Sequence, residues 1–418
     1  MIRKLSIFLV LLCLPCGLQA ADLPRAIPAE VGLSAEKLAL LKDHFQAYVD
    51  DGRLAGLTTL IAKGGKVAHF ETYGKRRLDA PETMPEDAIF RIYSMTKPIT
   101  GVALMMLYEE GKFELDDPVS AYIPAFGGQR VFKGVGDDGA MITEPVTREM
   151  TIRDLMRHTS GLSYGVFTET PVDLSYRKNK LVGFDQPLAE WAPKLAAEPL
   201  LYQPGAAWVY SLAVDVQGYL VEVLSGQSFD VFLKERIFDP LGMEDTGFYV
   251  PAEKLDRFVG IYTLGKESGL QATDDPLIQD FTVEPQFKSG GGGLVSTTAD
   301  YWRFAQMVAN GGALGGVRLL KSETIDLMRT DHLPAAVKGI NGKDVTGFGL
   351  DFAVVKDPAK FGGTGHAGEF YWGGMANTVF WIDPTEQIVA IFMTNVLPYG
   401  VSDFRQEMRK LVNDAVVD

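Results

Sequence analysis

The chain has 418 residues, of which 46% are hydrophobic and 22% charged, and its formal net charge at pH 7 is −14. This length and apolar content suffice for a large hydrophobic core, in one big domain with an insertion or in two closely packed lobes. An acidic surface repels phosphate backbones and anionic lipid, which argues against nucleic acid and membrane surfaces as partners.

The first 20 residues have the pattern of a secretory signal peptide. Arg3 and Lys4 form a basic start, an apolar stretch follows, and the small residues of "GLQAAD" provide a cleavage site. The apolar stretch is shorter than the ~20 residues that a membrane span needs. We therefore expect cleavage after Ala20 or Ala21, no membrane anchor afterwards, and a periplasmic or secreted protein.

Cysteine usage fits this expectation. Both cysteines, Cys13 and Cys16, lie in the signal segment, so the mature chain would hold no disulfide, no zinc–thiolate site and no cysteine nucleophile. Cleavage would also remove Arg3 and Lys4 and take the formal net charge from −14 to −16. The five histidines show no metal-ligand spacing, so we expect neither a metal nor a cofactor.

The segments nearest the two ends of the mature chain favour an antiparallel sheet. After a helix that begins at Ser34, the run "GLTTLIAKGGKVAHFETYG" alternates apolar and polar residues around Gly64-Gly65, which predicts a β-hairpin. Near the other end, "NTVFWIDPTEQIVAIFMTN" has two β-branched and aromatic runs separated by a turn at Asp383-Pro384. A charged helix is expected from about Ser402.

The middle of the chain has helical spacing, with start signals at Thr151 and Thr297. We therefore predict an α/β (α+β) fold: an antiparallel sheet flanked by helices and built from the N- and C-terminal segments, with an inserted all-helical lobe. A single mature domain would span 21–418 after a signal peptide at 1–20. Its sheet lobe would occupy about 25–90 and 290–418, and its helical lobe about 91–289. Two stretches, about 128–150 and 165–190, are predicted as irregular loops.

The pattern Ser-x-x-Lys occurs three times, and its context separates the three. Ser34 precedes an apolar helix and is best explained as an N-cap, with Lys37 pointing to water. Ser175 and Lys178 stand in "DLSYRKNK", which has no apolar periodicity and predicts a solvated loop.

Ser94 and Lys97 differ because Pro98 follows them at the start of a strongly apolar segment. Proline fits only the first turn of a helix, so the helix must begin at about Ser94 and place Lys97 one turn away on the same face. A serine hydroxyl at such a helix start can become a nucleophile if a base takes its proton, and a buried neutral lysine can serve. An N-cap serine with an exposed lysine remains an equal alternative on this segment alone.

The segments "SMTK", "LMRHTSGL", "YQPGAAWVYSLAVDVQGYLVEVLSG" and "GGGGLVSTTADYWRFAQMVANGG" resemble the serine β-lactamase-related hydrolases. This superfamily includes class C β-lactamases, D,D-peptidases and family VIII carboxylesterases. The resemblance implies that Ser94 is the acylated nucleophile, Lys97 its general base and Tyr210 a second-motif tyrosine within reach of Ser94. The second motif here is Tyr-Ser-Leu, so Leu212 replaces the asparagine usual in penicillin-active members.

The third motif of the superfamily, Lys-Thr-Gly or His-Thr-Gly, is also changed, and two registers are open. The first is His366-Ala367-Gly368; the second, Trp372-Gly373-Gly374, looks like the Trp-Gly-Gly of family VIII esterases and is preferred. In the second register, Met375 N–H would complete an oxyanion hole with Ser94 N–H. His366 would then be a pocket residue or a structural histidine.

An aromatic side chain at Trp372 in place of a strand lysine favours an uncharged acyl or alkyl group. The expected function is therefore hydrolysis of small carboxylic esters through an acyl-serine. A β-lactamase or D,D-peptidase acting on β-lactams or cell-wall peptides is the alternative, and relative rates on p-nitrophenyl esters and nitrocefin would separate the two. A non-catalytic protein that binds peptidoglycan fragments is a third possibility, and would leave Ser94 unlabelled by a fluorophosphonate probe.

Overall fold

The computed structural model describes residues 23–183, 185–265, 269–273 and 278–417. The predicted signal peptide at 1–20 lies outside these residues. The helices are α1 (Ala35–Asp50), α2 (Thr96–Glu109), α3 (Ile152–Met156), α4 (Pro171–Lys178), α5 (Leu188–Ala196), α6 (Ala213–Ser225), α7 (Phe229–Leu233), α8 (Asp239–Leu241), α9 (Thr298–Ala309), α10 (Ser322–Met328) and α11 (Phe404–Asp414). None of the helices in these ranges is long and apolar enough to cross a membrane.

The main sheet has seven antiparallel strands in the order β11-β12-β13-β14-β15-β1-β2. Its strands are β1 (Gly56–Lys63), β2 (Lys66–Gly74), β11 (Thr346–Phe348), β12 (Ala353–Val355), β13 (Phe370–Gly373), β14 (Val379–Asp383) and β15 (Ile388–Met393). Strands from the two ends of the chain therefore meet where β1 pairs with β15, which confirms the predicted fold class and both predicted hairpins.

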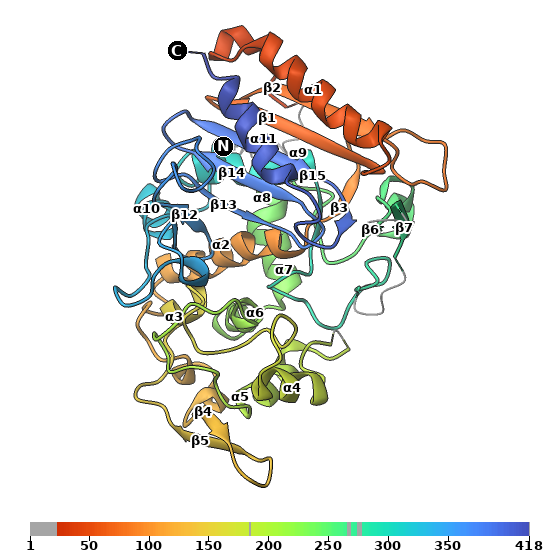
Figure 1. Cartoon of the computed structure of the whole chain (residues 1–418). Helices are drawn as coiled ribbons and strands as arrows, with labels where there is room; N and C mark the ends of the chain where they lie inside the picture. Colours follow the sequence, from red (N-terminus) through yellow and green to blue (C-terminus); the bar gives the residue numbers. More distant parts are fainter. Residues whose placement is uncertain (1–22, 184, 266–268, 274–277, 418) are drawn as a thin grey trace, which may run out of the picture.

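Both faces of this sheet are covered, which explains why its central strands are continuous apolar runs. Along β15, Ile388, Ala390 and Phe392 belong to the core under α1 and α11, whereas Val389, Ile391 and Met393 belong to the larger core on the other face. Figure 1 shows α1 and α11 together on one face of the sheet and α9 behind it. The side chains alternate because successive strand residues point to opposite faces.

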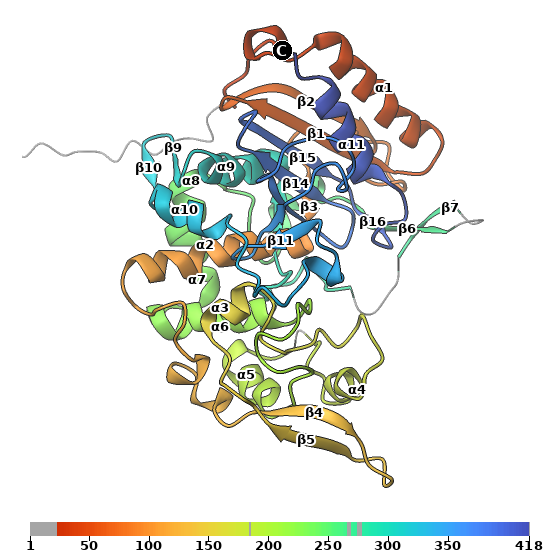
Figure 2. The same cartoon turned by 60° about the vertical axis from the view of Figure 1, so that its left-hand side comes forward.

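Smaller strand pairs complete the fold. These are β3 (Ile89–Arg91) with β8 (Val295–Thr297), β4 (Arg130–Val135) with β5 (Met141–Pro145), β6 (Tyr262–Gly265) with β7 (Gly269–Ala272) and β16 (Val396–Leu397), and β9 (Ala313–Leu314) with β10 (Val317–Arg318). The β4–β5 hairpin projects from the end of the molecule opposite to α1 (Figures 1 and 2).

Three details of the prediction were wrong. The inserted segment is not entirely helical, since the stretch predicted as a loop at 128–150 forms the β4–β5 hairpin. The stretch at 165–190 contains α4, which begins at a capping box of Thr170 and Asp173. Ser175 therefore lies in a helix, and its hydroxyl donates to Glu198 Oε2 at 2.7 Å. The cap predicted at Ser34 is confirmed, because its hydroxyl accepts from Lys37 N–H at 3.3 Å.

Candidate active site

Ser94 lies where a short strand passes into a helix. Strand β3 ends at Arg91, a short 3-10 turn, η2 (Tyr93–Met95), follows, and α2 continues from Thr96. The start of the helix falls within two residues of the predicted position, with Pro98 in its first turn. Tyr93 has a φ of 42°, a left-handed conformation that a tyrosine adopts only where its surroundings enforce it. The turn therefore holds Ser94 in a fixed position at the start of α2.

Lys97 lies on the same side of the turn as Ser94 and is buried, with 1% of its surface exposed. Its Nζ is 3.3 Å from Ser94 Oγ and donates to the Gly291 carbonyl at 2.5 Å. Lys97 Nζ also lies over the rings of Tyr210 and Tyr164, at 4.6 and 5.3 Å from their centroids. The alternative of an N-cap serine with an exposed lysine is therefore wrong for this pair.

Tyr210 reaches the same hydroxyl from another part of the chain. It lies in a segment without regular secondary structure, three residues before α6, and its phenol donates to Ser94 Oγ at 2.7 Å. The hydroxyl of Ser94 therefore accepts two hydrogen bonds, one from Lys97 and one from Tyr210. The sequence predicted these three residues together, and the structure brings them together.

A buried carboxyl that was not predicted from the sequence, that of Asp215, is linked to Lys97 through Gly291. Asp215 Oδ1 accepts from Gly291 N–H at 3.0 Å and from the Ser289 hydroxyl at 2.6 Å. A Cβ on Gly291 would lie 2.8 Å from Asp215 Oδ2, so glycine permits this approach. The pKa of Asp215 is raised, because the effect of burial outweighs the opposing effect of the nearby charge of Lys97. Asp215 therefore helps to fix Gly291, the residue whose carbonyl accepts the hydrogen bond from Lys97. The sequence held one signal for this role, because an aspartate inside the apolar run "LAVDVQGYL" indicates a buried carboxyl.

Two further buried groups lie near Lys97 and were also missed. Burial raises the pKa of Asp351 well above its usual value, although Gln217 Nε2 donates to its Oδ1 at 3.1 Å. Burial and the charge of Lys97 lower the pKa of His158 well below its usual value, so its imidazole is neutral. The Nδ1 of His158 lies 3.1 Å from Ser211 Oγ.

Aromatic rings surround the phenol of Tyr210. Five rings have centroids between 5.0 and 6.1 Å from the Tyr210 ring, namely those of His158, Tyr164, Phe167, Trp208 and Trp372. Phe348 adds an edge-on contact to Trp372 at 5.4 Å. These residues come from separate segments of the chain, so their gathering could not be predicted from local patterns. The cluster gives the space beside Ser94 a wall that suits uncharged groups.

The strand beside Ser94 is β13, which ends at Gly373 and lies against η2. A Cβ on Gly374 would lie 2.3 Å from the carbonyl oxygen of Ile92, so only glycine allows this approach. Trp372, Gly373, Gly374 and Met375 therefore lie beside the Ser94 turn, as the preferred register requires.

His366 lies elsewhere. Its Nδ1 is 2.7 Å from Asp383 Oδ2, and its Nε2 is 4.0 Å from Glu386 Oε1. Asp383 ends β14, which is antiparallel to β13, so it lies at the end of these strands opposite to Gly373. Among the described residues, His366 makes no hydrogen bond, ion pair or ring contact with Ser94, Lys97 or Tyr210, and the structure does not bring the first register, His366-Ala367-Gly368, to Ser94.

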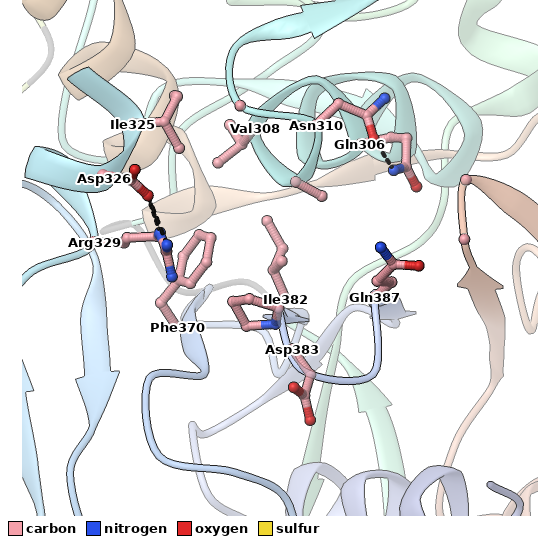
Figure 3. A pocket seen from close by; sticks show the side chains of 15 residues that line it. Gln306, Val308, Asn310, Ile325, Asp326, Arg329, Phe370, Ile382, Asp383 and Gln387 are labelled. Carbon is pink, nitrogen blue, oxygen red and sulfur yellow. Dashed lines mark hydrogen bonds and ion pairs between the residues drawn. The ribbon is translucent and has the colours of Figure 1, made fainter. Parts of the chain in front are cut away.

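A cavity of about 270 Å³ opens at that opposite end of the sheet (Figure 3). It is lined by α9, α10 and the turn after β14, and the pairs Asp326–Arg329 and Gln306–Asn310 border it. None of Ser94, Lys97, Tyr210 and Trp372 is among its lining residues. The cavity is therefore separate from the candidate active site.

An antiparallel sheet flanked by helices, with Ser-x-x-Lys at the start of a helix and a tyrosine phenol on the serine hydroxyl, is the architecture of the β-lactamase-related serine hydrolases. The comparisons agree with this class. The family model described as Beta-lactamase matches residues 41–413, so the chain belongs to this family, and it is a serine hydrolase.

Three relatives illustrate the similarity. The chain is 36% identical to Protein Rv1367c of Mycobacterium tuberculosis over 360 residues, which cover 84% of this chain and 88% of the relative. It is 32% identical to Esterase EstB of Burkholderia gladioli over 395 residues, which cover 90% and 95%. The solved structure of "EstCE1, a hydrolase with promiscuous acyltransferase activity" superposes with a TM-score of 0.75 at 26% identity, covering 92% and 99%.

Proposed function

We propose that this protein hydrolyses small carboxylic esters through an acyl intermediate on Ser94. The observation that carries the proposal is the position of Ser94 Oγ, which lies 3.3 Å from Lys97 Nζ and 2.7 Å from the Tyr210 phenol. These distances place both Lys97 and Tyr210 within reach of the Ser94 hydroxyl for proton transfer. The similarity to Esterase EstB supports the choice of esters.

In the acylation step, neutral Lys97 takes the proton of Ser94 while Oγ attacks the ester carbonyl carbon. The Gly291 carbonyl accepts one Lys97 N–H and helps to hold Nζ 3.3 Å from Ser94 Oγ. In neutral Lys97 a lone pair takes the place of the N–H that otherwise bonds to Ser94 Oγ. The backbone N–H groups of Ser94 and Met375 stabilise the negative oxygen of the tetrahedral intermediate. When the intermediate collapses, Tyr210 gives its proton to the leaving alkoxide, and Lys97 returns a proton to Tyr210.

Deacylation follows the same path with water in place of the alcohol. Tyr210 and Lys97 together take a proton from the water molecule that attacks the acyl carbon, and Ser94 Oγ regains its proton as the acid leaves. All the groups that this cycle needs are on the protein, and each ends in its starting protonation state. The proposal needs no metal or cofactor.

The aromatic cluster favours an uncharged acyl group. Trp372 is at the strand position where penicillin-active relatives would place a cation, and Trp208 stacks on Tyr210 at an interplanar angle of 12°. An acyl chain beside these rings gains from burial of apolar surface, about 25 cal/mol per Å². A free carboxylate in the same place gains nothing comparable.

The experiment is a panel of rates on short p-nitrophenyl esters and on nitrocefin, with Ser94→Ala as the control. The proposal expects kcat/KM for p-nitrophenyl butyrate to exceed that for nitrocefin, and both to vanish in Ser94→Ala. Faster turnover of nitrocefin would instead favour the β-lactamase alternative. Ester turnover that survives in Ser94→Ala would refute the acyl-serine mechanism.

We further propose that the protein is exported and that its signal peptide ends at Ala20 or Ala21. The support is the basic start, the short apolar stretch and the small residues that follow it. N-terminal sequencing of the protein from a periplasmic fraction tests this. A start at residue 21 or 22 agrees with the proposal, whereas an intact N-terminus in the cytoplasmic fraction contradicts it.

A further inference from the structure

The turn between β13 and β14, Gly374–Thr378, carries one of the two proposed oxyanion donors, Met375 N–H. Two backbone bonds close it: Gly374 N–H donates to the Thr378 carbonyl at 2.9 Å, and Asn377 N–H donates to the Gly374 carbonyl at 3.2 Å. Asn377 is buried and its Nδ2 donates to the carbonyls of Val396 and Pro398 at 2.8 and 3.0 Å. The turn is therefore held in place by the segment that follows β15.

Arg405, from the C-terminal helix α11, binds the same turn. Its Nη2 donates to the Gly374 and Thr378 carbonyls, each at 2.6 Å. The guanidinium lies over the ring of Tyr399, 4.4 Å from the centroid. A Cβ on Gly373 would lie 2.7 Å from the guanidinium atoms, so Gly373 leaves the space that Arg405 fills. Hydrogen bonds from an ionised donor are about twice as strong as neutral ones, which makes this a firm attachment.

The Gly374 carbonyl and the Met375 N–H belong to one peptide group. Leu397–Pro398 is the cis peptide bond that the described residues contain, so the bond between Gly374 and Met375 is trans. In a planar trans peptide, C=O and N–H point in opposite directions, and fixing one fixes the other. A flipped peptide would turn Met375 N–H toward the guanidinium, where two donors would face each other, and would aim the carbonyl at the proposed oxyanion position.

We propose that Arg405 is a positioning residue that holds the Gly374–Met375 peptide with its N–H directed at the oxyanion of the reacting ester. This inference rests on the proposed function, because it concerns the transition state of the reaction at Ser94. Arg405 does not touch the substrate and acts through the peptide. Its effect therefore falls on the tetrahedral intermediate and leaves the binding of the intact ester nearly unchanged.

The experiment measures kcat and KM for p-nitrophenyl butyrate together with inhibition by butylboronic acid, which forms a tetrahedral adduct on the serine. Loss of one oxyanion donor costs about 10²–10³-fold in kcat, and Arg405→Met should cost roughly 10- to 100-fold because the peptide still samples the correct orientation. We expect KM to change less than about threefold. The boronate inhibition constant should rise by the same factor as kcat/KM falls, and Arg405→Lys should recover part of the activity.

The matched control is the double variant Glu369→Gln/Arg409→Met. Arg409 lies one turn further along α11, is buried and paired with Glu369, and makes no hydrogen bond or ion pair with the Gly374–Thr378 turn in the described part of the chain. Removing both partners avoids a lone buried charge. We expect this variant to lower Tm while its kcat stays within about threefold of the wild-type value.

The inference is overturned if folded Arg405→Met keeps wild-type kcat and boronate affinity, or if the control loses kcat as much as Arg405→Met does. If Arg405→Met does not fold, Arg405→Lys gives the same comparison. A failure of the proposed function itself has a different signature, because ester hydrolysis by the wild-type protein would then be absent or would persist in Ser94→Ala.

Discussion

The replacement of Tyr210 by phenylalanine tests the proposed proton path most selectively. The substitution removes one oxygen, and with it the 2.7 Å bond to Ser94 Oγ. The ring keeps its neighbours, including Trp208 at 6.1 Å and Trp372 at 5.6 Å between centroids. Ser94 Oγ keeps its contact with Lys97 Nζ at 3.3 Å. The change therefore separates the chemical role of the phenol from the packing role of the ring.

The two roles predict effects of different size. A general acid–base group contributes roughly 10²–10⁴-fold to the rate, which corresponds to about 3–5 kcal/mol of barrier. A lost hydrogen bond changes the free energy of unfolding by only about 1 kcal/mol. We therefore expect kcat for p-nitrophenyl butyrate to fall by at least about a hundredfold in Tyr210→Phe, with Tm lowered by a few degrees.

The assay is initial-rate hydrolysis combined with thermal unfolding, and Tyr73→Phe is the control. The Tyr73 phenol is buried and lies 3.3 Å from Thr59 Oγ1 in the sheet, so its removal costs a comparable bond away from Ser94. We expect the control to lose stability and to keep its kcat. Less than a fivefold loss of kcat in folded Tyr210→Phe would refute the proposed role of the phenol.

Three other predictions concern the charged groups of the protein. Lys97→Ala should lower kcat by several orders of magnitude because Ser94 loses its proposed base; near-normal ester hydrolysis in this variant would exclude that role. Asp351→Asn should change the free energy of unfolding by less than about 1 kcal/mol, because burial raises the pKa of Asp351 and an amide has the shape of the protonated acid; chemical denaturation measures this, and a loss above about 3 kcal/mol would indicate an ionised carboxylate. Burial raises the pKa of Asp300 to about 6, so the folded protein holds a proton there that the unfolded chain loses above about pH 4. Wild-type stability relative to Asp300→Asn should therefore fall by up to about 3 kcal/mol as pH rises from 4 to 6, and a rise in denaturation midpoints over that range would contradict the assignment.

Local signals were enough to place Ser94 and Lys97 at the start of a helix, whereas their catalytic roles came from the resemblance. Pro98 fixed the start of α2 because proline tolerates only the first helical turn, and the structure has it there. The two hairpins were predicted from the alternation of apolar and polar residues and from turn residues between the strands, and the fold class followed from their positions at both ends of the chain. Tyr210 was placed by resemblance alone, since it lies just before α6 in a segment without regular secondary structure.

The residues that support the site come from far along the chain, and no local rule connects them to Ser94. Gly291 holds Lys97 from 194 positions away, and Asp215 in turn holds Gly291. Arg405 reaches the β13–β14 turn from α11, a distant helix whose buried side chains Phe404, Met408 and Val412 indicate packing and not a link to Ser94. The missed helix α4 is different, because Thr170, Pro171 and Asp173 form a start signal that could have been recognised.

The most direct test of the central claim is mass spectrometry of the protein quenched during turnover of p-nitrophenyl butyrate. We predict a butyryl adduct on the peptide that contains Ser94, accumulating in Tyr210→Phe and absent from Ser94→Ala. Rapid ester hydrolysis without any adduct on that peptide, or an adduct on another residue that turns over at the catalytic rate, would contradict the account.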